Sequence, residues 1–134
     1  METSPHSEFI AFYGSLMRGF GAQEDLQIES KLEFTGACQI PGTLHDLGEF
    51  PALAASATGC VHGELYRIKD PGVIPQLDAY EEFDPANPDR SLFVRRRVRL
   101  VEPDLDCWVY FYNRPPPDDR LISSGSWSAH RRPS

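Results

Sequence analysis

The chain has 134 residues, a net charge of −7, and 40% hydrophobic, 11% aromatic and 25% charged residues. This composition is typical of one globular domain that is long enough to bury a sizeable core. The acidic balance argues against a nucleic-acid partner, and the lack of about 18 consecutive apolar residues excludes a membrane-spanning helix.

The first predicted element is a buried strand at Phe9–Tyr13, where all five residues are apolar or aromatic. The strand ends abruptly at Gly14 and Ser15, and successive backbone N–H groups at such a turn can form an anion-binding nest. Glycine lets a ligand approach the backbone closely because it has no Cβ. An ordinary strand-to-loop turn is the alternative interpretation.

A short helix is expected at Ala22–Leu26, and further segments have the patterns of strands. These are Leu32–Ile40, Thr43–Leu53 as a strand followed by a loop that carries Phe50 and Pro51, Cys60–Lys69 with a bulge at Gly63, Leu92–Val101, and Cys107–Tyr112. The arginine-rich face of Leu92–Val101 is predicted to be solvated. About six strands with one main helix indicate an α+β fold, with a sheet that curves toward a barrel around a pocket.

The main helix is predicted over Asp70–Phe83, with Asp70 as N-cap and Pro71 at the first helical position. Its apolar stripe consists of Val73, Ile74, Leu77 and Tyr80. Glu81 projects from the inner edge of this stripe. Burial would raise the pKa of that carboxyl and make it a better base near neutral pH. A salt bridge to one of the arginines is the alternative.

The remaining features concern the two ends of the chain, its location in the cell, and its cysteines and histidines. Residues 1–8 are expected to form a flexible leader without the features of a signal peptide, which favours the cytoplasm. The domain is expected at residues 9–127 and a flexible tail at 128–134, and Trp127 is a candidate lid, plug or subunit contact. The three cysteines form no CxxC pair and the four histidines show no metal-ligand spacing, so reduced thiols and no metal site are expected.

Five motifs in order, from Phe9 to about Trp127, give the chain a resemblance to the gamma-glutamylcyclotransferase superfamily, in its small AIG2-like branch. They are the YGSL loop Tyr13-Gly14-Ser15-Leu16, the segment GTLHDLGEFPAL from Gly42 to Leu53, VHGELY from Val61 to Tyr66, LDAYE from Leu77 to Glu81, and the strand from Trp108 to Asn113. The resemblance implies a small mixed β-barrel with flanking helices and one pocket.

In active members of this family, the glutamate at the position of Glu81 accepts and donates protons. The resemblance implies that the loop at Tyr13, Gly14, Ser15 and Leu16 holds the gamma-glutamyl group of the substrate through backbone N–H groups. The resemblance thus implies an enzyme that releases 5-oxoproline and a free amine from a small gamma-glutamyl amine or peptide. It implies no cofactor, and the expected partner is this small-molecule substrate, with no nucleic acid and no membrane, for a monomer or a homodimer.

Two residues depart from the family pattern. Glu82 stands where members often have glycine, and Phe93 stands where many have tyrosine; Tyr110 and Tyr112 are candidates to replace that hydroxyl. Two other functions remain open, a gamma-glutamyl hydrolase in the same pocket and a non-catalytic module that binds a small ligand.

Overall fold

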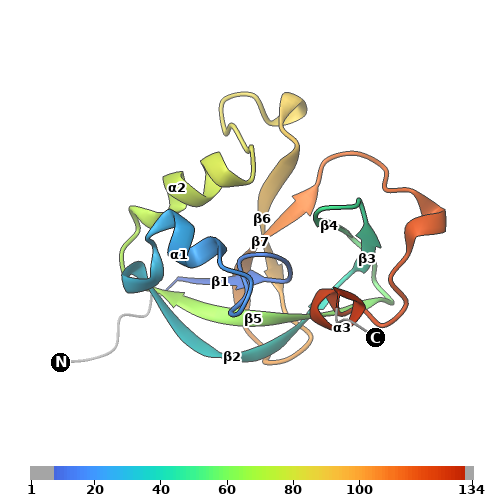
Figure 1. The fold of residues 1–134 in the computed structure, drawn as a ribbon, viewed down its shortest axis with the longest axis horizontal. Coiled ribbons are helices and arrows are strands. Elements are labelled where there is room, and N and C mark those ends of the chain that lie inside the picture. Colours follow the sequence, from blue (N-terminus) through green and yellow to red (C-terminus); the bar gives the residue numbers. More distant parts are fainter. Residues whose placement is uncertain (1–7, 132–134) are drawn as a thin grey trace.

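Strand β1 (Phe9–Phe12) lies at the centre of a five-stranded sheet with the order β2-β5-β1-β7-β6 (Figure 1). The structure is a computed structural model and describes residues 8–131. The other strands of this sheet are β2 (Leu32–Pro41), β5 (Cys60–Ile68), β6 (Phe93–Arg99) and β7 (Asp106–Tyr112). β1 pairs antiparallel with β5 and parallel with β7. A central strand is covered on both faces, which explains its uninterrupted apolar sequence.

The second sheet is a hairpin of β3 (Thr43–Asp46) and β4 (Pro51–Ala54). The prediction of a strand followed by a loop is therefore wrong for the second half of this segment. The Gly48 N–H donates to Asp46 Oδ1 at 2.7 Å, and Gly48 has a φ of +104°, which suits glycine. These two residues build a turn that returns the chain into a strand.

Three short helices complete the part of the chain that the structure describes: α1 (Ala22–Leu26), α2 (Val73–Tyr80) and α3 (Trp127–Arg131). Single 3₁₀ turns lie at Glu29–Lys31, Pro88–Arg90 and Asp118–Arg120. The expected main helix is α2, but it is shorter than predicted at both ends. The carboxylate of Asp70 accepts the N–H of Gly72 at 2.9 Å in a turn, and Gly72, not Asp70, is the N-cap.

The bulge predicted at Gly63 lies instead on the neighbouring strand, between Phe34 and Gly36. Gly63 keeps regular register opposite Cys38. A Cβ at Gly63 would lie 2.6 Å from the carbonyl oxygen of Phe12. Glycine is required there because β5 and β1 approach closely, not because the strand bends.

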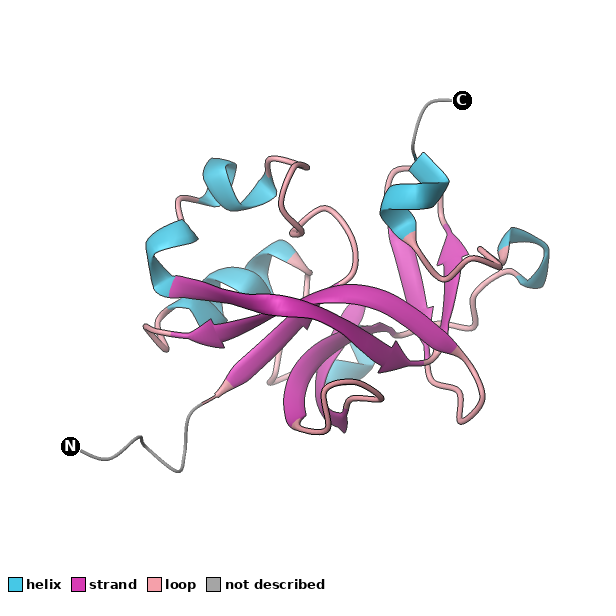
Figure 2. Ribbon diagram, turned by 90° about the horizontal axis from the view of Figure 1, so that it is seen from below, coloured by secondary structure: helices cyan, strands magenta, loops and turns pink. Residues whose placement is uncertain are grey.

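The α+β class is confirmed, but the expected barrel is not closed. The main sheet ends at β2 on one side and β6 on the other. Figure 2 shows that its strands curve strongly. A single bridge joins the two sides, in which the Gln39 N–H donates to the carbonyl of Glu102 at 2.7 Å. The curvature brings the sheet edges near each other at one point without forming a ladder.

The described residues next to the expected domain, Glu8 and residues 128–131, are held by contacts or in a helix. Glu8, assigned to the leader, accepts hydrogen bonds from Arg97 Nη1 and Trp108 Nε1, both at 2.8 Å. Helix α3 starts at Trp127 and continues to Arg131, within the segment assigned to the tail. The rest of the predicted leader and tail, residues 1–7 and 132–134, lies outside the described residues. No helix in the described part of the chain is both long and apolar enough to cross a membrane.

Candidate active site

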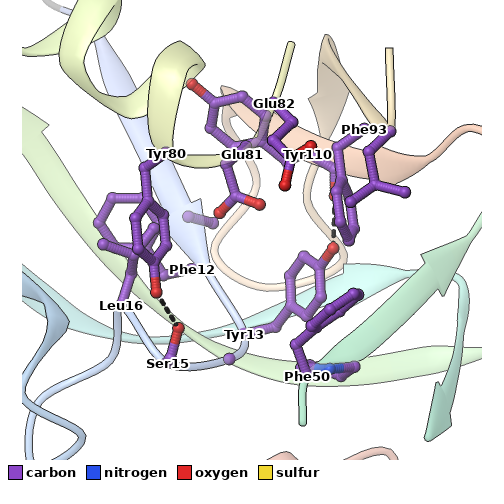
Figure 3. A pocket seen from close by; sticks show the side chains of 14 residues that line it. Phe12, Tyr13, Ser15, Leu16, Phe50, Tyr80, Glu81, Glu82, Phe93 and Tyr110 are labelled. Carbon is purple, nitrogen blue, oxygen red and sulfur yellow. Dashed lines mark hydrogen bonds between the residues drawn. The ribbon is translucent and has the colours of Figure 1, made fainter. Parts of the chain in front are cut away.

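A cavity of about 230 Å³ lies between the end of α2, the loop after β1, the β3–β4 hairpin and strands β6 and β7 (Figure 3). All five residues that the sequence singled out line it: Tyr13, Gly14, Ser15, Leu16 and Glu81. The other lining residues are Ala11, Phe12, Phe50, Pro51, Tyr80, Glu82, Leu92, Phe93 and Tyr110. The wall is mostly apolar and aromatic, with few polar groups, as is typical of a small-molecule site.

The loop after β1 is a tight turn in which the Met17 N–H donates to the carbonyl of Gly14 at 3.0 Å. Among residues 8–131, the backbone N–H groups of Gly14, Ser15 and Leu16 have no hydrogen-bond acceptor. A Cβ on Gly14 would lie 3.0 Å from Cγ of Pro51, so the loop packs tightly against the start of β4. Consecutive N–H donors without acceptors can hold an anionic oxygen.

Glu81 lies at the C-cap of α2, and the chain turns away immediately after it. The Phe83 N–H donates to the carbonyl of Asp78 and the Glu82 N–H donates to that of Ala79, which is the pattern of a Schellman motif. Glu82 adopts the left-handed conformation that this motif requires, with a φ of +57°. The helix therefore ends at a defined residue, and its last turn directs Glu81 into the cavity (Figure 3).

Burial raises the pKa of Glu81 from its ordinary 4.5 to about 8. None of the hydrogen bonds and ion pairs found in residues 8–131 involves the carboxyl of Glu81, whose oxygens are not fully buried. The alternative of a salt bridge to an arginine is therefore wrong for this residue. A carboxyl that is partly buried, unpaired and titrates near neutral pH has the properties of a proton carrier.

A hydrogen-bonded network behind the cavity was not predicted. Asp78 accepts the Tyr110 hydroxyl at 2.6 Å and binds Arg95 through Nε at 2.8 Å and Nη2 at 3.1 Å. The Tyr13 hydroxyl donates to the carbonyl of Tyr110 at 2.6 Å. The network thus fixes two aromatic walls of the cavity. Only the position of Asp78, three residues before Glu81, hinted that it faces inward.

The arginine-rich face of β6 is only partly solvated, which corrects the prediction. The Arg95 side chain is 15% exposed, because it pairs with Asp78 and lies 4.5 Å from the centre of the Trp108 ring. Arg97 and Arg99 are more exposed and bind acidic residues at the surface. Strand β6 is seven residues long. Arg95, near its start, therefore lies against helix α2, whereas Arg99, at its end, lies beyond that helix.

The candidates to replace the missing tyrosine hydroxyl occupy different places. Phe93 lines the cavity and packs edge-on against Phe50 and Tyr112. Tyr110 also lines it, but its hydroxyl is bound to Asp78, and burial raises its pKa far above the ordinary value. Tyr112 is not among the lining residues. Tyr80, which sequence reasoning did not select, places its hydroxyl 2.8 Å from Ser15 Oγ.

Trp127 is buried and does not line the cavity, so the lid alternative is wrong. It packs in the core at the start of α3, whose His130 Nε2 contacts Asp46 Oδ2 at 2.8 Å. No group of three or more histidine, cysteine or acidic side chains in residues 8–131 is arranged to hold a metal ion.

Comparison with known sequences identifies the class of protein that this fold and cavity define. The profile of the family described as "Gamma-glutamyl cyclotransferase, AIG2-like" matches residues 10–129. The chain therefore belongs to the AIG2-like gamma-glutamyl cyclotransferase family, and the resemblance inferred from the five motifs is confirmed.

Individual relatives agree with this assignment. A Vibrio cholerae protein provisionally named a gamma-glutamylcyclotransferase is 30% identical over 129 residues, which cover 91% of this chain and 95% of the relative. The gamma-glutamylcyclotransferase family protein YtfP of Escherichia coli is 34% identical over 84 residues, covering 63% of this chain and 66% of its own length. The crystal structure of an AIG2-like protein from Mus musculus superposes with a TM-score of 0.69 at 26% identity, covering 90% of this chain and 88% of that one.

Proposed function

We propose that the protein is a cofactor-independent gamma-glutamyl cyclotransferase. The alpha-amino nitrogen of a gamma-glutamyl amine or peptide would attack its own gamma-carbonyl carbon. The new carbon–nitrogen bond closes the ring of 5-oxoproline, and the bond to the leaving amine breaks. The nucleophile belongs to the substrate, so the site needs only to fold the substrate, carry a proton and stabilise the oxyanion.

One observation carries the proposal: a partly buried carboxyl and three backbone N–H groups, all without a hydrogen-bond partner among residues 8–131, line the same small cavity. Glu81 supplies the proton carrier, and the loop from Gly14 to Leu16 supplies donors for an anionic oxygen. The turn against Pro51 and the Ser15–Tyr80 contact hold this loop in place before substrate arrives.

The protonation of Glu81 is consistent with the proton transfers that this reaction requires. The attacking amine enters as an ammonium and must lose a proton. Its positive charge beside Glu81 favours the carboxylate form, which lowers the pKa of Glu81 from about 8 once substrate is bound. A carboxylate whose pKa is raised by partial burial is a stronger base than one in water, so it can take the ammonium proton and return it to the leaving nitrogen.

The test compares release of 5-oxoproline by the wild type and by Glu81→Gln from a panel of gamma-glutamyl amines and dipeptides. Removing a general acid–base group costs about 10²- to 10⁴-fold in rate, so release should fall at least 10²-fold in the variant. Asp118→Asn is the control, because Asp118 is exposed and does not line the cavity.

Equal release by the wild type and Glu81→Gln would remove Glu81 from its proposed role. Glutamate in place of 5-oxoproline would identify the hydrolase alternative. Binding of a gamma-glutamyl compound without turnover in either protein would identify the non-catalytic module.

A further inference from the structure

Glu82 is the one ionisable residue of the cavity wall that the proposed reaction does not use and that replaces a small residue of the family pattern. It lines the cavity beside Glu81, and both carboxyl groups project from the same turn at the end of α2 (Figure 3). Its side chain has no ion-pair partner among residues 8–131. The residue is exposed.

The charged residue types in the cavity wall are all acidic. Its ionisable residues are two carboxyls, Glu81 and Glu82, and three tyrosines; no lysine, arginine or histidine of residues 8–131 lines the cavity. Arg95 lies behind Tyr110, where its charge is balanced by Asp78 at 2.8 Å. A leaving group that carries a carboxylate would meet a negative wall with no cation to pair with.

A second hollow, of about 310 Å³, shares the lining residue Glu82 with the cavity. Its other lining residues are Asp84, Asn87, Arg90 and Ser91. An extended leaving group would therefore pass Glu82 on its way from the cavity to this polar hollow. Arg90 lines this hollow but not the cavity.

We infer that Glu82 determines the leaving group: the site selects gamma-glutamyl derivatives of amines that carry a second positive charge, such as a diamine, over neutral amines and over amino acids. The free ammonium of the diamine, several bonds from the scissile nitrogen, pairs with the Glu82 carboxylate. This inference rests on the proposed function, because it names the substrate class of the same site.

The test uses three amides that differ in the end of the leaving group: gamma-glutamyl-1,4-diaminobutane, gamma-glutamyl-n-pentylamide, in which a methyl replaces the ammonium, and gamma-glutamylglycine. Formation of 5-oxoproline gives kcat/KM for each with the wild type, Glu82→Gln and Asp118→Asn. The last variant removes one negative charge at an exposed site on the turn Asp118–Arg120, away from both hollows.

The wild type should favour the diamine derivative over the pentylamide by about 5-fold, the upper range for a solvent-accessible ion pair, and disfavour the glycine derivative further. In Glu82→Gln the ratio of diamine to pentylamide should fall to about 1, and in Asp118→Asn it should stay near 5. Added salt should reduce the preference of the wild type.

Three results would overturn the inference while leaving the proposed function intact: no preference in the wild type, an unchanged preference in Glu82→Gln, or an equal loss on all three substrates, which would place Glu82 on the gamma-glutamyl half. Failure of the folded wild type to release 5-oxoproline from any of the three would instead overturn the proposed function, and this inference with it.

Discussion

Glu81 combines two properties that rarely occur together, a partly buried position and a carboxyl without a partner among residues 8–131. Its ion-pairing candidates are engaged elsewhere: Arg95 binds Asp78, and Arg97 binds Glu8. The protein therefore bears the cost of desolvating this carboxylate, because no arginine offsets it. Such a cost is typical of a residue kept for chemistry and not for stability.

Replacing Glu81 by glutamine should stabilise the fold in a pH-dependent way. The folded-state pKa is raised from 4.5 to about 8, so the stability contribution of Glu81 is fully present below pH 4.5 and is lost as pH rises through 8. Glutamine does not titrate. The free energy of unfolding of Glu81→Gln should therefore gain on that of the wild type across this window, by on the order of a few kcal/mol.

Urea unfolding of both proteins between about pH 4.5 and about pH 9 measures this difference, since a single domain of this size usually unfolds in two states. Glu33→Gln is the matched control, because Glu33 is exposed in its pair with Arg67. Curves for Glu81→Gln and the wild type that stay parallel across the window would contradict the desolvated carboxyl.

At the scale of elements, the contact between α2 and the β6–β7 hairpin positions the cavity. Asp78 of α2 receives Arg95 from β6 and Tyr110 from β7, so one carboxylate joins three elements. The same helix presents Glu81 one turn later. The position of the proton carrier therefore depends on a polar contact and not only on the apolar stripe of the helix.

Asp78→Ala should destabilise the protein by about 2–4 kcal/mol, because it leaves a partly buried guanidinium and the Tyr110 hydroxyl without their acceptor. Glu33→Ala removes an exposed ion pair with Arg67 and should cost under about 1 kcal/mol. Urea unfolding of the two variants checks the contrast. Similar losses in both would mean that the buried network adds no more than a surface pair.

The sequence predicts contacts between residues that are close along the chain better than contacts between residues that are far apart along it. The five site residues could be placed together because the strand, its glycine turn and the helical stripe are local patterns, supported by a recognisable family motif. The Asp78–Arg95 pair could not, because 17 residues and a loop separate its members and a run of arginines is usually solvated. The hairpin β3–β4 was missed since Phe50 and Pro51 were assigned to a loop, whereas Gly48 lies in the hairpin turn and Pro51 is the first residue of β4.

At the scale of the whole molecule, the C-terminal segment, residues 117–131, connects strands that are distant in the sequence. The alternation of apolar and polar residues did not predict these contacts. The His62 N–H donates to the carbonyl of Gly125 at 2.8 Å, and the Ile122 N–H donates to that of Leu44 at 2.7 Å. The segment thus packs on β5 and β3. Closure of a sheet is likewise a long-range property, which is why a curved open sheet and a barrel share one sequence pattern.

The C-terminal segment supports the cavity from a distance, through the β3–β4 hairpin. The hairpin contributes Phe50 and Pro51 to the cavity wall, and Pro51 packs against Gly14 of the loop. On its other side, His45 contacts the carbonyl of Pro117, and Asp46 contacts His130 of α3. Trp127, only 2% exposed, anchors this segment in the core.

Trp127→Ala should therefore cost about 3–5 kcal/mol in the free energy of unfolding, as expected for truncating a large buried aromatic residue. It should also speed hydrogen exchange at the Leu47 N–H, which closes the hairpin turn onto the Phe50 carbonyl at 3.0 Å. Leu121→Ala is the matched control, because Leu121 lies in the same segment but is 52% exposed, and it should change stability by under about 1 kcal/mol. A hairpin that exchanges at the wild-type rate in a destabilised Trp127→Ala protein would show that the segment stabilises the core without supporting the cavity wall.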